Sequence, residues 1–138
     1  MKRLIAFALV LVMVLTLCAT AFAANPSASV VSKYKSQTVK RGKTVKWEFQ
    51  LKCGSYKRQG TTWRASFDSY IAKGGKKGTI YASTYTLYFT GNGKHTVKWK
   101  VPKTVPTGKY TLGYYTSYRD NKGRWHATST KTAKLTVK

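Results

Sequence analysis

The sequence alternates apolar and polar residues with a period of two along most of its length beyond the N-terminal region. In the clearest stretch, residues 44–52, Val45, Trp47, Phe49 and Leu51 alternate with polar or charged side chains. Successive side chains of a β-strand point to opposite faces, so this pattern predicts a strand with one buried and one solvated face. No convincing helical periodicity competes with it. The sequence therefore predicts an all-β protein.

Similar stretches recur and are separated by short segments rich in Gly, Pro and Asn. This spacing is typical of β-sandwiches, and we expect about seven or eight antiparallel strands in two sheets. The aromatic residues at inward positions, which we expect in the core, are Trp47, Trp63, Trp99, Tyr110 and Tyr114. The predicted strands cover residues 30–39, 44–52, 62–71, 79–90, 94–101, 110–118 and 125–138, the first of them weakly.

Two of these strands begin with nearly the same residues. The segment 42–47 (GKTVKW) recurs as 93–99 (GKHTVKW) with one inserted residue. In a sandwich of this kind we expect these two strands, second and fifth in order, to lie side by side. Trp47 and Trp99 would then point inward from one sheet, and Trp63 would pack against them from the other.

Two short motifs carry a resemblance to known modules. Val39-x-x-Gly42-x-Thr44-Val45 is similar to the start of the second strand, and residues 105–112 (VPTGKYTL) to the start of the sixth, of immunoglobulin-like and fibronectin-III-like modules of exported bacterial proteins. The resemblance covers most of residues 37–137 and lacks the cysteine pair of antibody domains. It implies an immunoglobulin-like sandwich with Tyr110 as the corner tyrosine, and a non-enzymatic role in adhesion, spacing or binding.

The N-terminal region has the features of an export signal. Lys2 and Arg3 precede the uncharged apolar run 4–18, and Ala21-Phe22-Ala23 has the small-x-small pattern of a cleavage site. We therefore expect a signal peptide at residues 1–23 and a single domain at residues 24–138 that is secreted and then either released or held at the envelope by charge. An uncleaved membrane anchor is the alternative, and the shortness of the strongly apolar run disfavours it.

Cys53 is the only cysteine beyond the predicted signal peptide. No disulfide within the chain can then form, and the core has to stabilise the fold without one. A buried thiol at the end of a strand is favoured, since free Cys is often buried. A cross-link between two copies is the alternative.

The balance of charge is strongly basic, with 26 Lys and Arg against 3 Asp and Glu and a formal net charge of +23. An excess of this size exceeds what solubility requires and predicts an anionic partner, although a surface tuned only for solubility is the alternative. Teichoic acid, acidic glycan, an anionic lipid surface and extracellular nucleic acid all qualify, and Lys-rich surfaces favour delocalised attraction over specific readout. The alternation places the candidate polyanion-binding residues on one outer face and a neighbouring turn: Lys46, Lys52, Lys94, Lys98, Lys100, Lys40, Arg41 and Lys43.

A second function class rests on aromatic residues. The opposite sheet is expected to expose a nearly neutral face rich in Tyr and Thr, suited to a carbohydrate- or protein-binding adhesion module. Scattered surface aromatics are the plainer interpretation, because strands favour them. The candidate aromatic platform consists of Tyr70, Tyr88, Tyr115 and Trp125.

Catalysis finds little support in this chain. Its carboxylates are Glu48, Asp68 and Asp120, and its histidines are His95 and His126. No spacing among them indicates a metal site, and no motif surrounds Cys53 that would pair an activated thiolate with a base. We therefore expect no enzyme activity, no catalytic residues, no bound metal and no cofactor.

Overall fold

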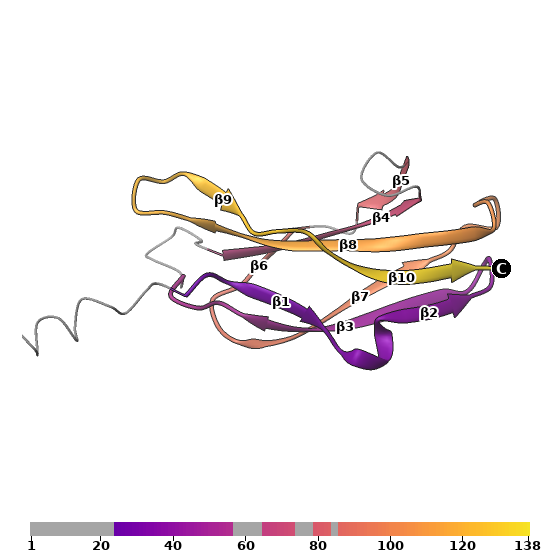
Figure 1. Cartoon of the computed structure of the whole chain (residues 1–138), viewed down its shortest axis with the longest axis horizontal. Helices are drawn as coiled ribbons and strands as arrows, with labels where there is room; N and C mark the ends of the chain where they lie inside the picture. The colour runs from indigo at the N-terminus through magenta and orange to yellow at the C-terminus, as the bar shows by residue number, and fades with distance from the viewer. Residues whose placement is uncertain (1–23, 57–64, 74–78, 84–85) are drawn as a thin grey trace, which may run out of the picture.

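The computed structural model describes residues 24–56, 65–73, 79–83 and 86–138. Figure 1 shows two layers of strands, with β4 and β8 in one and β3 and β7 in the other. The described residues form the strands β1 (Ser27–Val30), β2 (Ser36–Val39), β3 (Thr44–Lys52), β4 (Ala65–Lys73), β5 (Thr79–Ser83), β6 (Leu87–Tyr88), β7 (Gly93–Lys100), β8 (Gly108–Arg119), β9 (Trp125–Ala127) and β10 (Lys131–Val137), and the 3-10 turn η1 (Ser32–Tyr34).

The two sheets differ in size. The smaller has the order β1-β3-β7, and the larger has the order β2-β10-β8-β4-β5, with β6 paired to β4 and β9 paired to β8. Every pairing is antiparallel except that of β2 with β10, which is parallel. The all-β, two-sheet architecture expected from the alternation is therefore confirmed.

The predicted number of strands was too low, because the described residues form ten. The expected strand 30–39 is two strands in different sheets, since η1 carries the chain from β1 in the smaller sheet to β2 in the larger. The expected strand 125–138 is also divided. Between β9 and β10 the side chain and backbone N–H of Thr128 both bond to the Thr116 carbonyl, which interrupts the strand.

The segment predicted as strand 79–90 forms the short strands β5 and β6, and the predicted strand 62–71 corresponds to β4. Residues 57–64, 74–78 and 84–85 lie outside the described residues, and with them the expected core residue Trp63. Short strands of two to five residues leave too few alternating positions for sequence patterns to separate them.

The similarity between residues 42–47 and 93–99 predicted the pairing correctly. β3 and β7 lie side by side, with Trp47 opposite Val97 and Val45 opposite Trp99. Trp47, Trp99, Tyr110 and Tyr114 are all buried, as expected. The indole Nε1 of Trp47 has no hydrogen-bond partner among the described residues.

Aromatic rings join the two sheets at the centre of the core. The Phe49 ring of β3 lies 4.9 Å from the Phe67 ring of β4 and 4.9 Å from the Tyr114 ring of β8, measured between centroids. Both contacts are tilted or edge-on, the geometry that aromatic pairs prefer. Cys53 is also buried, as expected, and carries a free thiol.

Tyr110 ties the start of β8 to the loop before it. Its hydroxyl donates a hydrogen bond to the carbonyl oxygen of Pro106, at 2.5 Å. A tyrosine that bonds to backbone a few residues upstream is the contact expected of a corner tyrosine. Burial raises the pKa of Tyr110, followed by the influence of Tyr81, whose ring packs edge-on against it.

Candidate binding faces of the two sheets

The outer face of the smaller sheet carries most of the predicted polyanion-binding residues. Even-numbered residues of β3 and β7 point outward because their neighbours Val45, Trp47, Val97 and Trp99 fill the core. This basic face, as we call it, consists of the exposed lysines Lys46, Lys52, Lys94, Lys98 and Lys100.

Two lysines of the basic face stand directly opposite each other. Lys46 of β3 is the registered partner of Lys98 of β7. Cβ atoms of such partners are about 4.5–5.5 Å apart, and like charges at this spacing destabilise a sheet. Lys100 follows Lys98 on the same face of β7 and pairs with Thr44. Positive charge is thus concentrated on the outer face of β3 and β7.

One carboxylate, Glu48, partly offsets this charge. Its Oε1 accepts a hydrogen bond from the Tyr34 hydroxyl at 2.7 Å and lies 3.4 Å from Lys46 Nζ. The Tyr34 hydrogen bond holds the pKa of Glu48 below its ordinary value, with smaller contributions from the nearby lysines. Lys33 Nζ lies 4.8 Å from the centroid of the Tyr34 ring. At the edge of the face, Tyr34 is thus close to two ammonium groups, those of Lys33 and Lys46, and to the Glu48 carboxylate.

A basic turn continues the face at one end. Lys40, Arg41 and Lys43 lie in the turn between β2 and β3, where Gly42 has a φ of +78° and lets the chain reverse. The turn is fixed by hydrogen bonds from Gly42 N to Val101 O and from Val101 N to Lys43 O, at 2.8 and 2.9 Å. Lys103 approaches the same turn, with its Cγ 3.5 Å from where a Cβ on Gly42 would lie.

Sequence reasoning missed Lys103 and Tyr34 as members of this region. Lys103 lies in the loop after β7 and Tyr34 in η1, so neither position belongs to an alternating segment. These two residues join the region only because the loop after β7 and the turn η1 fold back beside the basic face.

The outer face of the larger sheet gathers all four residues of the predicted aromatic platform. Tyr70 of β4 pairs with Gly113, Tyr115 of β8 pairs with Asp68, and both pairs face outward. A Cβ on Gly113 would lie 2.3 Å from the Tyr70 ring, so this ring lies flat over the sheet where a side chain is missing. Burial raises the pKa of Tyr115, followed by the charge of Asp68 and the influence of Tyr70.

Tyr88 and Trp125 complete this aromatic face and meet above it. Tyr88 of β6 pairs with Ser66, which pairs with Ser117, which in turn pairs with Ala127 of β9. The two aromatic residues thus start on strands three spacings of about 4.8 Å apart, yet their ring centroids are 6.3 Å apart. The small side chains of Ser66 and Ser117 leave room for both rings to lean toward each other over the outer face. Each ring residue remains 47% exposed.

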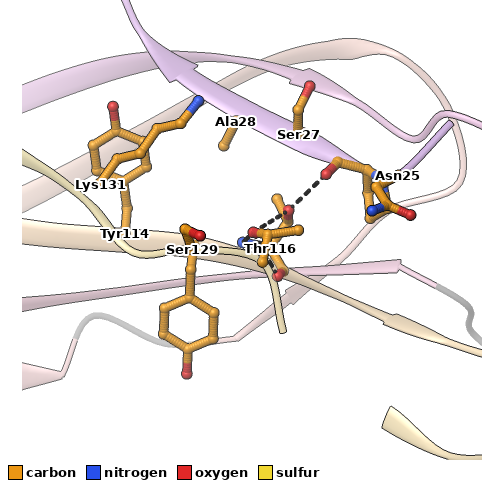
Figure 2. Close-up of a pocket in the computed structure, with 10 residues that line it drawn as sticks. Asn25, Ser27, Ala28, Tyr114, Thr116, Ser129 and Lys131 are labelled. Carbon is orange, nitrogen blue, oxygen red and sulfur yellow. Dashed lines mark hydrogen bonds between the residues drawn. The ribbon is translucent and has the colours of Figure 1, made fainter. Parts of the chain in front are cut away.

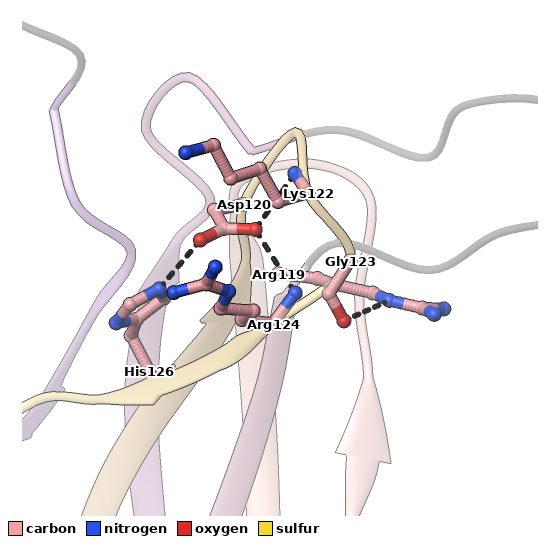
Figure 3. Close-up of polar contacts among 6 residues, drawn as sticks. All are labelled: Arg119, Asp120, Lys122, Gly123, Arg124 and His126. Carbon is pink, nitrogen blue, oxygen red and sulfur yellow. Dashed lines mark hydrogen bonds and ion pairs between the residues drawn. The ribbon is translucent and has the colours of Figure 1, made fainter.

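A polar turn fixes the strand that carries Trp125. Asp120 Oδ1 accepts hydrogen bonds from the backbone N–H groups of Lys122 and Arg124, and its Oδ2 lies 2.8 Å from His126 Nε2, as Figure 3 shows. The His126 contact, followed by the Arg124 backbone, holds the pKa of Asp120 below its ordinary value. Arg119 Nε also bonds to the Gly123 carbonyl. These contacts define the β8–β9 hairpin.

A pocket of about 210 Å³ opens at the edge between the sheets, beside β1. Figure 2 shows Ala28, Tyr114, Thr116 and Lys131 around it. Thr116 is buried, and its hydroxyl donates to the Pro26 carbonyl and contacts the Thr128 hydroxyl. The polar atoms of Thr116 are therefore used within the fold.

Apart from the contact between Asp120 and His126, the described residues with catalytic or metal-binding potential are spread apart. His95 packs edge-on against the Phe67 ring, and burial lowers its pKa. Glu48, Asp68 and Asp120 lie in three separate regions: the basic face, the aromatic face and the β8–β9 turn. Within the described ranges, no group of three His, Cys, Asp or Glu side chains is placed to hold a metal ion.

None of the helices in the described part of the chain is long and apolar enough to cross a membrane.

No protein-family model and no curated protein matches the chain. Solved structures with a similar fold include the major subunit of aggregative adherence fimbriae type I from Escherichia coli, with 14% identity, coverage of 85% of this chain and 98% of that chain, and a TM-score of 0.44. A Niemann-Pick type C2 protein from Japanese carpenter ant has 9% identity, coverage of 83% and 90%, and a TM-score of 0.45. Superoxide reductase (neelaredoxin) from Ignicoccus hospitalis has 14% identity, coverage of 81% and 80%, and a TM-score of 0.40. At these values the likenesses concern the β-rich fold and carry no argument about function.

Proposed function

We propose that this chain is an exported, non-catalytic binding module that associates with anionic surface polymers through its basic face. The observation that carries the proposal is the facing pair of Lys46 and Lys98 on the exposed face of β3 and β7. Like charges in register weaken a sheet, so their placement together favours a role in binding over a role in stability. A polymer of regularly spaced anionic groups suits such a face because each contact releases counterions from the polymer.

The surrounding basic residues extend the basic face along β3 and β7, so that an extended polymer could contact it at several points. Lys94 and Lys52 lie toward one end of β3 and β7, and Lys100 and the β2–β3 turn lie toward the other. Glu48 is engaged by Tyr34 and Lys46, which limits its repulsion of an anionic ligand.

The proposal includes the class and location of the module. The Tyr110 contact with Pro106 supports an immunoglobulin-like sandwich. Residues 1–23 have the composition of a cleaved signal peptide, which supports an extracellular location. There, cell-wall teichoic acids and acidic glycans are the polyanions nearest at hand, ahead of anionic lipid surfaces and extracellular nucleic acid. Asp120 and His126, which are in contact, fix the β8–β9 turn, and Glu48 and Asp68 lie in other regions, which supports a role without catalysis.

The test compares two triple variants with the same change in net charge. One carries Lys46→Glu, Lys98→Glu and Lys100→Glu, and the control carries Lys109→Glu, Lys131→Glu and Lys134→Glu, three exposed lysines of the larger sheet. Binding of residues 24–138 to cell walls, walls stripped of teichoic acid, heparin and DNA is measured over a salt series. We expect the first variant to lose affinity and to lower the salt slope by about 0.7–0.9 for each phosphate contact removed. Equal losses in both variants would reject a specific basic face.

A further inference from the structure

The aromatic face, formed by Tyr70, Tyr88, Tyr115 and Trp125, lies on the opposite side of the sandwich from the basic face. It is assembled from β4, β6, β8 and β9, which lie side by side in the larger sheet. From Ser117 to Gly113 along β8 the face extends about 14 Å, taking about 3.4 Å per residue. We propose that this face binds a neutral glycan chain by stacking its sugar rings on the aromatic side chains.

The exposure of the rings supports a role in ligand binding and not in the packing of the core. Tyr88 and Trp125 are each 47% exposed although they are among the largest apolar side chains. The two rings lie against each other at a tilt of 49°, and about half of each side chain remains open to solvent. Sugar rings present apolar C–H faces of comparable width, whereas a protein partner would need a broader contact area.

The carboxylate of Asp68 favours an uncharged ligand over an anionic one. Asp68 lies at its centre, opposite Tyr115, and accepts hydrogen bonds from the hydroxyls of Ser66 and Thr86. A carboxylate has about four acceptor sites, so Asp68 retains capacity for sugar hydroxyls while it repels phosphate and sulfate groups. This separates the aromatic face from the basic face, where lysines surround the single carboxylate Glu48.

The rings are held in place before any ligand binds. Gly113 leaves the space over which Tyr70 lies, and Ser66 and Ser117 leave the space toward which Tyr88 and Trp125 lean. The Asp120 turn fixes β9 and with it the position of Trp125. Rings that are already ordered lose little conformational entropy on binding, which favours a weak ligand such as a sugar.

The test measures binding of neutral oligosaccharides by calorimetry in 0.5 M NaCl, which screens the basic face. The probes are cellohexaose, chitohexaose and maltohexaose, and the variants are Trp125→Ala, Trp125→Phe and Tyr115→Ala. We expect at least one probe to bind, Trp125→Ala to weaken it about fivefold or more, as for ring removal from other stacking sites, and Trp125→Phe to restore most of the affinity.

Two controls separate this proposal from the proposed function. Ile80→Ala removes an apolar side chain that is 58% exposed on the same sheet without removing a ring, and it should leave binding unchanged. The Lys46, Lys98 and Lys100 triple variant should also bind the sugar normally. Absence of binding by all three probes, binding that survives Trp125→Ala and Tyr115→Ala, or stacking of single-stranded DNA alone would overturn the proposal while leaving the polyanion experiment to be judged separately.

Discussion

The two sheets of this sandwich share one core and differ in what they show to solvent. The smaller sheet exposes lysines from β3 and β7, and the larger exposes aromatic rings from β4, β6, β8 and β9. Packing requirements are the same on both inner faces, where the alternating positions are apolar. The outer faces are free of that requirement, and their contrast is the basis on which we propose a separate binding role for each.

The largest expected effect comes from removing the ring that joins the two sheets. Phe49→Ala takes away the contacts with Phe67 and Tyr114 and leaves a cavity in the core. We expect the free energy of unfolding to fall by about 3–5 kcal/mol, the range for Phe→Ala in cores. Urea denaturation followed by tryptophan fluorescence measures it. A loss below 1 kcal/mol would show that the sheets do not depend on this contact.

A change confined to the larger sheet is Gly113→Ala. The new Cβ would lie 2.3 Å from the Tyr70 ring, which must move away. We expect the free energy of unfolding to fall by about 1–3 kcal/mol, as for other overpacked sites. The double variant with Tyr70→Ala should recover part of the loss, because residues in contact are not additive. Polyanion binding by the basic face should stay unchanged, and if it falls equally, the two faces are coupled.

The smallest expected effect is on the smaller sheet. Lys98→Glu replaces the repulsion between Lys98 and Lys46 with an attraction across the strands. We expect the free energy of unfolding to rise by about 0.2–1 kcal/mol, while affinity for heparin falls. Lys134→Glu is the control, because Lys134 pairs with Thr111 and Ser36 and with no lysine. Destabilisation by Lys98→Glu would contradict the repulsion argument.

Sequence patterns predicted the strands that are long and half-buried. β3 and β7 alternate over eight or nine residues, and their shared motif even indicated that they pair. β6 and β9, with two and three residues, have no pattern of their own. They form because they pair with the end segments of β4 and β8, and this pairing exists only in the folded sheet.

The two candidate faces were predictable to different degrees. Outward positions of the lysines follow from alternation alone, so the basic face could be drawn from the sequence. The exposure of Tyr88 and Trp125 was also predicted, but their meeting above Ser66 and Ser117 was not. That contact depends on the order of four strands and on small residues between them, which no single segment of sequence contains.

The parallel pairing of β2 with β10 has a mechanical consequence. In Figure 1, β1 lies toward one end of the long axis and the end of β10 toward the other. Tension between these points pulls β2 and β10 in opposite directions along their lengths, because the two strands run the same way. The hydrogen bonds between β2 and β10 are then loaded in shear. All of them carry the force at once, and they are not broken one after another. A module loaded along this direction, between two surfaces, would resist extension until these bonds break as a group.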